Sequence, residues 1–148
     1  VSFWSREDWT LDSSMAMHSE TTKIVFEASY RYLAALKPTG SVSVWKIKGE
    51  EPSHQWDLNF HSVTKILSNP LVENQFFVMM SSDDKADTQN SVLLFQFSRP
   101  QNLIMYWKFK TPITGIHFVN ALSCLYVSNR NGECQKIYCS VSQDKLKE

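Results

Sequence analysis

The sequence predicts an all-β fold made of tandem four-stranded antiparallel units, and three observations support this prediction. Apolar residues either alternate with polar ones or form short continuous runs, as in strands that bury one or both faces. β-branched and aromatic residues, which favour strands, fill these runs. Polar stretches with turn-forming residues separate the runs, and the whole pattern recurs along the chain.

The clearest unit lies at residues 22–47 and contains three expected strands, KIVFEA, YRYLAAL and SVSVWKI. The second and third are joined by Lys37-Pro38-Thr39-Gly40. Proline fixes φ in this segment, and glycine can adopt the positive φ of a tight turn. We therefore expect an antiparallel hairpin here.

The other expected strands follow in the same order. Two short runs at residues 1–5 and 8–13 precede the clearest unit, and a polar link at 48–53 follows it. Further strands are expected at 55–60, 63–70, 74–81, 91–97, 105–111, 113–119, 122–129 and 133–139. Residues 1–140 are thus expected to hold about three units, and the polar residues 141–148 a linker or tail.

The repeat can be measured from residues that occupy the same place in successive units. The tryptophans Trp9, Trp56 and Trp107 are 47 and 51 residues apart. The hairpin residues Gly40, Asn90 and Gly132 are 50 and 42 residues apart, and a long loop at 81–90 explains the uneven spacing. A period in this range with four short strands per unit is typical of a β-propeller, in which each unit forms one blade.

These units resemble the blades of the WD-repeat family over nearly the whole chain, to about residue 140. His61-Ser62-Val63 matches the position of the family's histidine, Pro70 matches a frequent proline, and Trp45 matches the family's tryptophan. The resemblance implies that His61, Ser62 and Trp45 stabilise a blade through hydrogen bonds. The periodicity places Trp9, Trp56 and Trp107 on outer strands with one face packed inward.

The chain departs from the family's pattern at several positions. Lys46 follows Trp45 where the family has aspartate, and the aspartate expected in the hairpin turn is replaced by Thr39 or Asn131. The polar network of the blades is therefore incomplete. We expect apolar packing between neighbouring units to carry more of the stability.

About three units are too few to close a propeller, which needs roughly four to eight blades. Each repeat can bury its faces only against its neighbours. The chain also begins with Val1 in an apolar run that looks like the inside of a strand. We therefore expect an incomplete propeller, with the remaining blades supplied by the same polypeptide or by a partner chain.

Charge, hydrophobicity and cysteine content narrow the possible partners and location of the protein. The formal net charge is zero, which gives no long-range attraction to nucleic acid, and the apolar runs are too short to span a bilayer. The three cysteines, Cys124, Cys134 and Cys139, are expected to be free thiols because hairpin register would not place the first two opposite each other. With no N-x-Ser/Thr sequon, this favours an intracellular protein of the nucleus or cytoplasm.

No motif for catalysis, cofactor binding or metal binding stands out, so we expect a protein that is not an enzyme. The cysteines and His117 fall on different expected strands without a C-x-x-C knuckle. The acidic segment at 83–87 lacks the glycine and closing glutamate of a calcium loop. His61 with Ser62 suits a blade-stabilising hydrogen bond better than a hydrolase site.

The predicted function is that of a scaffold presenting loops to other proteins of a complex. The hairpin loops at 37–40, 81–90 and 129–132 should form the docking face, because the resemblance implies that they share one rim with His18, His61 and Thr111. The candidate binding residues are Lys37, Asp83, Asp84, Lys85, Asp87 and Arg130. The alternative is an RNA-associated propeller of a ribonucleoprotein or ribosome-assembly complex.

Overall fold

The computed structural model describes residues 2–4, 11–14, 20–47, 53–60, 62–81 and 90–138. Throughout these ranges the regular structure is β, apart from one short 3₁₀ helix, η1 (Asn120–Leu122). The predicted all-β fold is therefore confirmed. None of the described segments forms a helix with the length and apolar character needed to cross a membrane.

Every sheet is antiparallel, and the strand order within each sheet follows the chain order. β1 (Ser2–Trp4) and β2 (Leu11–Ser14) form a two-stranded sheet. The next sheet contains β3 (Lys23–Phe26), β4 (Tyr32–Leu36), β5 (Val42–Lys46) and β6 (Ser53–Leu58). The third contains β7 (Val63–Ser68), β8 (Gln75–Met80), β9 (Ser91–Gln96) and β10 (Leu103–Lys108). The last contains β11 (Ile113–Val119), β12 (Cys124–Asn129) and β13 (Cys134–Tyr138).

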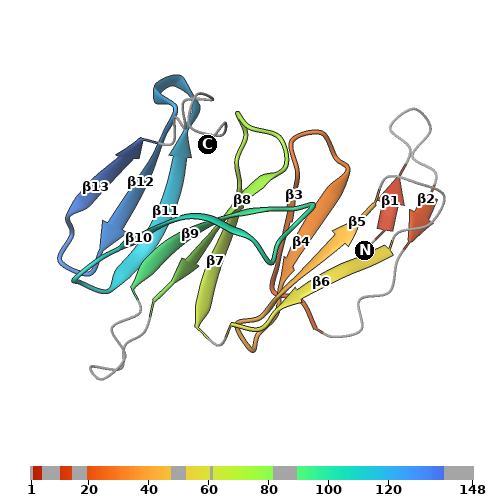
Figure 1. Cartoon of the computed structure of the whole chain (residues 1–148), viewed down its shortest axis with the longest axis horizontal. Helices are drawn as coiled ribbons and strands as arrows, with labels where there is room; N and C mark the ends of the chain where they lie inside the picture. Colours follow the sequence, from red (N-terminus) through yellow and green to blue (C-terminus); the bar gives the residue numbers. More distant parts are fainter. Residues whose placement is uncertain are drawn as a thin grey trace.

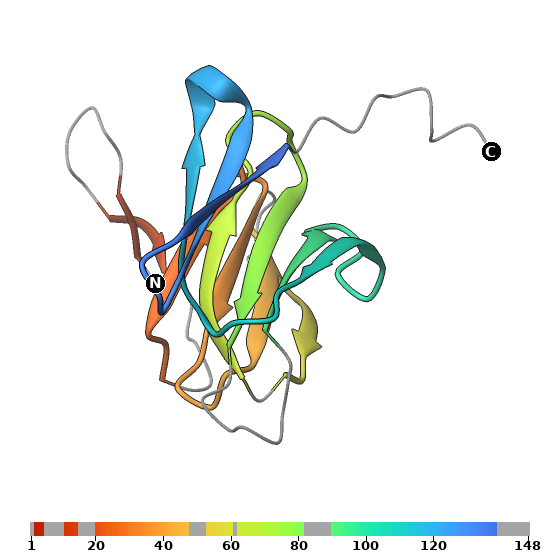
Figure 2. The same ribbon diagram turned by 90° about the vertical axis from the view of Figure 1, so that its left-hand side faces the viewer.

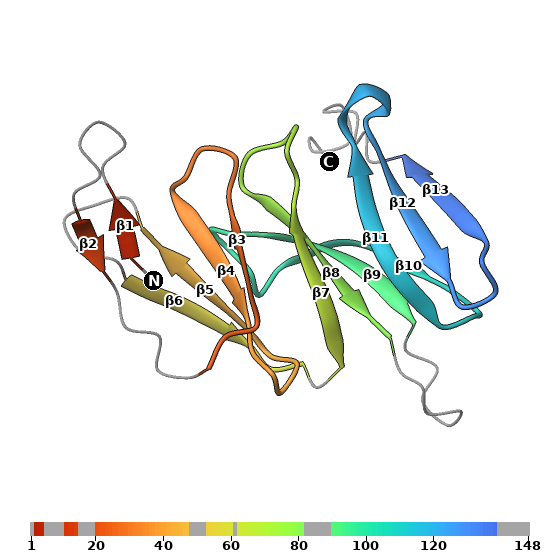
Figure 3. The same ribbon diagram turned by 180° about the vertical axis from the view of Figure 1, so that it is seen from behind.

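The sheets stand in a row in the order of the chain (Figure 1). The first strands β3, β7 and β11 lie on one side of the row and face the viewer in Figure 3, whereas β10 crosses in front in Figure 1. β7 contacts both β3 and β11. Viewed along the row, with the β11–β13 sheet nearest, the sheets lie one behind another (Figure 2).

The core fills the two seams between the large sheets. In the first seam, Val25, Ala34, Leu36, Val42 and Val44 pack against Val63, Ile66, Phe76, Val78, Met80, Phe95 and Phe97. In the second seam, Phe77, Met79, Val92 and Leu94 pack against Ile113, Phe118, Leu125, Val127 and Ile137. Alternate residues of β8 therefore face different seams. This explains why residues 76–80 of β8 are continuously apolar in sequence, since both faces of the strand are buried.

The predicted hairpin between β4 and β5 is confirmed. Gly40 has a φ of 81°, and its backbone N–H donates to the Lys37 carbonyl at 3.0 Å. The Lys37 N–H in turn donates to the Ser41 carbonyl at 2.9 Å. A side chain at Gly40 would be strained in this conformation. The local turn chemistry therefore sets the register of β4 against β5.

Several expected strands, among them those at 8–13, 55–60, 63–70 and 122–129, have different limits in the structure, and for two others the cause is local. β10 covers residues 103–108 rather than 105–111, because its last pair is Lys108 with Ser91, the residue at which β9 begins. Residues 109–112 connect the two sheets instead. β4 begins at Tyr32 rather than Tyr30, since Tyr30 has a φ of 58° and its N–H donates to the Glu27 carbonyl at 2.9 Å in a turn.

A buried carboxylate organises that turn. Glu27 is 1% exposed, and its side chain accepts hydrogen bonds from the Ser29 hydroxyl at 2.9 Å, the Arg31 backbone N–H at 3.1 Å and the Arg31 guanidinium at 2.8 Å. Arg31 also lies 3.6 Å from Glu73 of the next sheet. Burial raises the pKa of Glu27, but the hydrogen bonds from Arg31 and Ser29 outweigh it and hold the pKa below its usual value.

We expect Glu27→Gln to lower the free energy of unfolding by about 2 kcal/mol at pH 7, because charge-assisted hydrogen bonds from Arg31 are lost. A lowered folded-state pKa gives stability above the unfolded-state pKa that is lost as the pH falls through the folded-state pKa. The difference between wild type and variant should therefore shrink on acidification. Urea unfolding at neutral and acidic pH measures both effects.

Glu73→Gln is the matched control, since it removes only the exposed partner of Arg31. A loss equal to that of Glu27→Gln would contradict the role given to the buried carboxylate.

Candidate functional site

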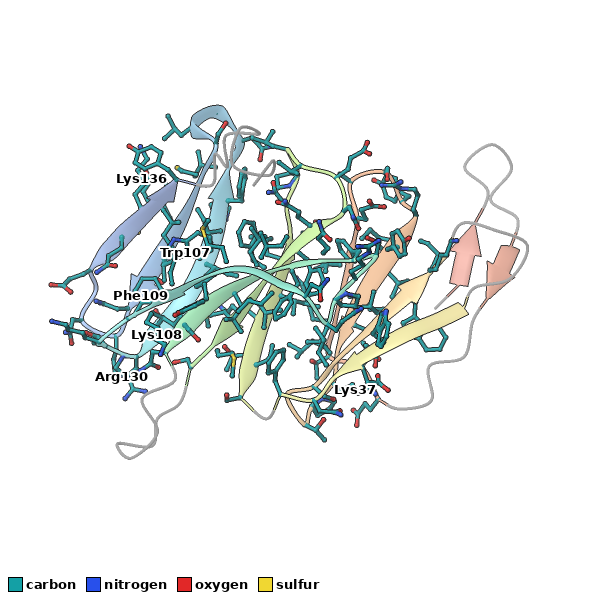
Figure 4. All side chains as sticks on the ribbon, in the orientation of Figure 1. Lys37, Trp107, Lys108, Phe109, Arg130 and Lys136 are labelled. Atoms are coloured by element: carbon teal, nitrogen blue, oxygen red, sulfur yellow. The ribbon has the colours of Figure 1, made fainter. Side chains whose placement is uncertain are left out.

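The hairpins β4–β5 and β12–β13 turn at the same edge of the row, the lower edge in Figure 1. Lys37 and Arg130 both lie at this edge, on different sheets (Figure 4). The other candidate binding residues, Asp83, Asp84, Lys85 and Asp87, lie outside the described residues. Of the candidate binding residues at the predicted docking rim, the structure describes Lys37 and Arg130. The binding role of the 81–90 loop stays a prediction.

A hollow of about 350 Å³ opens at this rim. We call it the rim groove, and it lies between the end of β10, the segment that follows β10, and the β12–β13 hairpin. It is lined by Lys108, Phe109, Lys110, Thr111, Ile113, Val127, Asn129, Glu133 and Gln135. Ile113 and Val127 are nearly fully buried and give it an apolar floor, whereas the other lining residues are polar apart from Phe109.

The β12–β13 hairpin is held in place by one asparagine side chain. Asn129 Oδ1 accepts from the backbone N–H groups of Asn131 and Glu133, each at 3.0 Å, while its Nδ2 donates to Glu133 Oε2 at 2.8 Å. Gly132 completes the turn with a φ of 80°. Such side-chain bonds to nearby backbone groups are the reason asparagine favours turns.

Backbone hydrogen bonds join the groove to the neighbouring segments. The Arg130 N–H donates to the Pro112 carbonyl at 3.0 Å, which ties the hairpin to the segment before β11. The Phe109 N–H donates to the Asn90 carbonyl at 2.8 Å, which ties that segment to the start of β9. The connection between the two sheets is therefore held at both of its ends by main-chain hydrogen bonds, each of which continues the strand pairing of one sheet.

The groove carries mixed charge with a positive excess. Lys108, Lys110 and Arg130 stand at or beside it, against Glu133, whose carboxylate accepts from Asn129. Figure 4 shows Lys108, Phe109 and Arg130 near one another at the end of the β11–β13 sheet. Lys37 lies apart from them and pairs with Asp57 at 3.5 Å. The structure therefore brings Arg130 to the groove but not Lys37.

The residues expected to stabilise blades have different surroundings. Trp45 is buried against Leu33 and Ala35, and Trp107 packs against the second seam. Trp56, expected to pack inward, is 41% exposed. It lies on β6, the last strand of its sheet, where fewer side chains are available to cover it.

Two of the residues expected to stabilise blades, His61 and Trp9, lie outside the described residues. Ser62 is half-buried before β7, and its carbonyl accepts from the Ser81 N–H at 3.4 Å. The hydrogen-bond role given to His61 and Ser62 stays a prediction.

The cysteine prediction holds for the two described cysteines. Cys124 pairs with Tyr138 and Cys134 with Ser128 across the β12–β13 hairpin, so the two thiols are not opposite each other. Both are free, Cys124 buried and Cys134 exposed. Within the described ranges, no group of three or more histidine, cysteine, aspartate or glutamate side chains is arranged to hold a metal ion.

Sequence reasoning missed Lys108, Lys110 and Glu133 as site residues. The alternation in MYWKFKT predicts one strand, which would place its lysines on a sheet face. The groove forms because β10 ends at Lys108 and the chain turns toward the next sheet. The Lys-Phe-Lys alternation was the available signal, but the hairpin that closes the groove lies about twenty residues away in the chain.

Comparison with known proteins gives likeness of fold only. No known family matches the chain, and no curated protein matches it. A solved protein of unknown function from Desulfotomaculum acetoxidans DSM 771 matches 92% of this chain with a TM-score of 0.62 at 9% identity. A candidate 6-phosphogluconolactonase from Bacteroides fragilis NCTC 9343 matches 84% with a TM-score of 0.56 at 11% identity. This chain spans 47% and 40% of those two chains, so it is similar to about half of each.

We expect Asn129→Ala to loosen the groove wall and to lower the free energy of unfolding by about 1–2 kcal/mol, since two backbone N–H groups lose their acceptor. Hydrogen exchange of the Asn131 and Glu133 amides should accelerate. Asn131→Ala is the control, because its backbone N–H rather than its side chain takes part in the turn. Equal exchange rates in both variants would rule out this role for the Asn129 side chain.

Proposed function

We propose that the sheets are blades of an incomplete WD-repeat-like β-propeller, and that the chain is a non-enzymatic scaffold whose rim groove binds a segment of a partner protein. Three features support the blade arrangement: antiparallel four-stranded sheets in chain order, contacts between their first strands, and apolar seams between their faces. These are the features that radial repetition of four-stranded sheets requires.

Within the described part of the chain, the sheets at the two ends of the row have fewer strands than the two sheets between them. The β11–β13 sheet has three strands, and the β1–β2 sheet has two, against four in the sheets between them. On the propeller proposal, the remaining blades come from further parts of the same polypeptide or from a partner chain. They would cover the outer faces of these sheets and remove their open edges.

The rim groove is the proposed binding site for the partner protein. It combines a nearly buried apolar floor, Ile113 and Val127, with polar walls in which lysines oppose a glutamate. Protein interfaces pair an apolar centre with a polar rim in this way. Because backbone hydrogen bonds already fix the walls of the groove, binding costs little conformational entropy of the protein. This favours capture of an extended segment.

An RNA-associated propeller is the second candidate, favoured by the three cations Lys108, Lys110 and Arg130 near the groove. The zero net charge of the chain counts against it. The lactonase name of one solved neighbour supports no activity here, because likeness at 11% identity concerns the fold alone.

The test reverses two charges of the groove in the full-length protein, as Lys108→Glu with Lys110→Glu. The matched control is Lys46→Glu with Lys136→Glu, which makes the same charge change on exposed residues that do not line the groove. Affinity capture with cross-linking should show protein partners bound by wild type and control, with about ten-fold weaker binding by the groove variant.

Two results would overturn the proposal. One is equal retention of every protein partner by the groove variant and the control. The other is recovery of RNA in place of protein, with affinity that falls steeply as salt is raised, which would establish the second candidate.

A further inference from the structure

A repeated tripeptide lies at or next to the start of the first strand in each of the three large sheets. Thr-Lys-Ile occurs at residues 22–24 and again at 64–66, and Thr-Gly-Ile occurs at 114–116. Each threonine hydroxyl bonds to the second strand of its own sheet: Thr22 to the Leu36 carbonyl at 3.1 Å, Thr64 to the Met79 carbonyl at 3.4 Å, and Thr114 with the Ser128 hydroxyl at 3.1 Å. The three positions are therefore equivalent in structure as well as in sequence.

The lysines of the first two tripeptides line one cavity of about 410 Å³. We call it the inner cavity, and its lining residues come mainly from β7 and from β3 and β11 on either side of it, the first strands that face the viewer in Figure 3. Its lining is Thr22, Lys23, Leu36, Thr64, Lys65, Ile66, Leu67 and Ile116. It therefore combines two ammonium groups with four apolar side chains, in a volume typical of small-molecule sites.

The second lysine is held in position by the third sheet. Lys65 Nζ donates to the Thr114 carbonyl at 3.1 Å, which leaves its other two N–H groups available. Glycine replaces lysine at the third position, and a Cβ at Gly115 would come within 3.4 Å of Lys65 Nζ and 3.1 Å of Ser128 Oγ. The Lys65 ammonium therefore lies beside the third tripeptide, at about contact distance from where a side chain at Gly115 would begin.

The charges of both lysines are not balanced by the described carboxylates. The ion pairs within the described ranges join Arg31 to Glu27 and Glu73, and Lys37 to Asp57. Neither Lys23 nor Lys65 takes part in them. Both lysines are exposed, and two cations lining one hollow attract an anion with a strength that falls as salt is raised.

We propose that the inner cavity binds a small organic oxyanion, with its phosphate or carboxylate oxygens held by Lys23 and Lys65. The threonine hydroxyls of Thr22 and Thr64 already donate within their sheets, so the lysines are the donors to the ligand. The apolar residues Leu36, Ile66 and Ile116 would contact the carbon part of the ligand. This site is separate from the rim groove and does not depend on it.

The experiment titrates the full-length protein with pyrophosphate and, separately, with citrate, by isothermal titration calorimetry at low and physiological salt. The two probes distinguish a phosphate from a carboxylate ligand. The variants are Lys23→Gln, Lys65→Gln and the double variant, with Lys46→Gln as a control on an exposed lysine outside the cavity.

Wild type and Lys46→Gln should bind at least one probe at a single site. Each cavity variant should bind about ten-fold more weakly, because one charge-assisted hydrogen bond is lost, and the double variant should not bind measurably. Lys23→Gln leaves the bond from Lys65 to Thr114 intact, so it tests the site even if Lys65→Gln loosens the seam. Thermal unfolding of each variant monitors that effect.

Absence of binding of both probes to wild type would overturn the proposal. So would equal affinity in wild type and the double variant. A loss of the same size in Lys46→Gln would also overturn it, since the attraction would then come from overall charge rather than from this cavity.

Discussion

The packing of each sheet against its neighbours is the constraint on which the rest of the structure depends. Phe76 and Phe77 are consecutive residues of β8, both without measurable exposure, and they belong to different seams. A strand buried on both faces is stable only if another sheet covers each face. The β7–β10 sheet therefore positions both neighbouring sheets. The order of the first strands β3, β7 and β11 follows from the same contacts.

Polar interactions add specificity at the ends of the strands, outside the apolar seams. The Glu27 and Arg31 pair closes the β3–β4 turn and reaches Glu73 of the next sheet. At the opposite edge, the Arg130 N–H bonds to the Pro112 carbonyl and closes the rim groove. The sequence predicts an incomplete polar network within each unit. The contacts of Arg31 and Arg130 are polar contacts of another kind, which join neighbouring segments at the strand ends. Their directional bonds fix how the sheet ends meet, which apolar packing alone does not.

The two proposed sites form at different places in the same row of sheets. The rim groove forms where a connection and a hairpin from adjacent sheets meet, so its residues are brought together from 108–113 and 127–135. The inner cavity forms along neighbouring first strands, so equivalent residues of successive units line it together. Repetition in sequence thereby places two lysines in one cavity. The rim groove thus includes loop residues, which differ between units. The inner cavity is built mainly from strand residues, which recur from unit to unit.

The sequence by itself determined the all-β class, the strand order and the hairpin turns at Gly40 and Gly132, because alternation and turn chemistry are local properties. Only the tertiary structure decided that Trp56 is exposed, that Lys65 reaches the Thr114 carbonyl, and that the Lys108 segment joins the β12–β13 hairpin in one groove. Alternation tells which side chains share a face, but not which distant segment covers that face. That is set by packing between sheets, whose contacts join residues far apart in the chain.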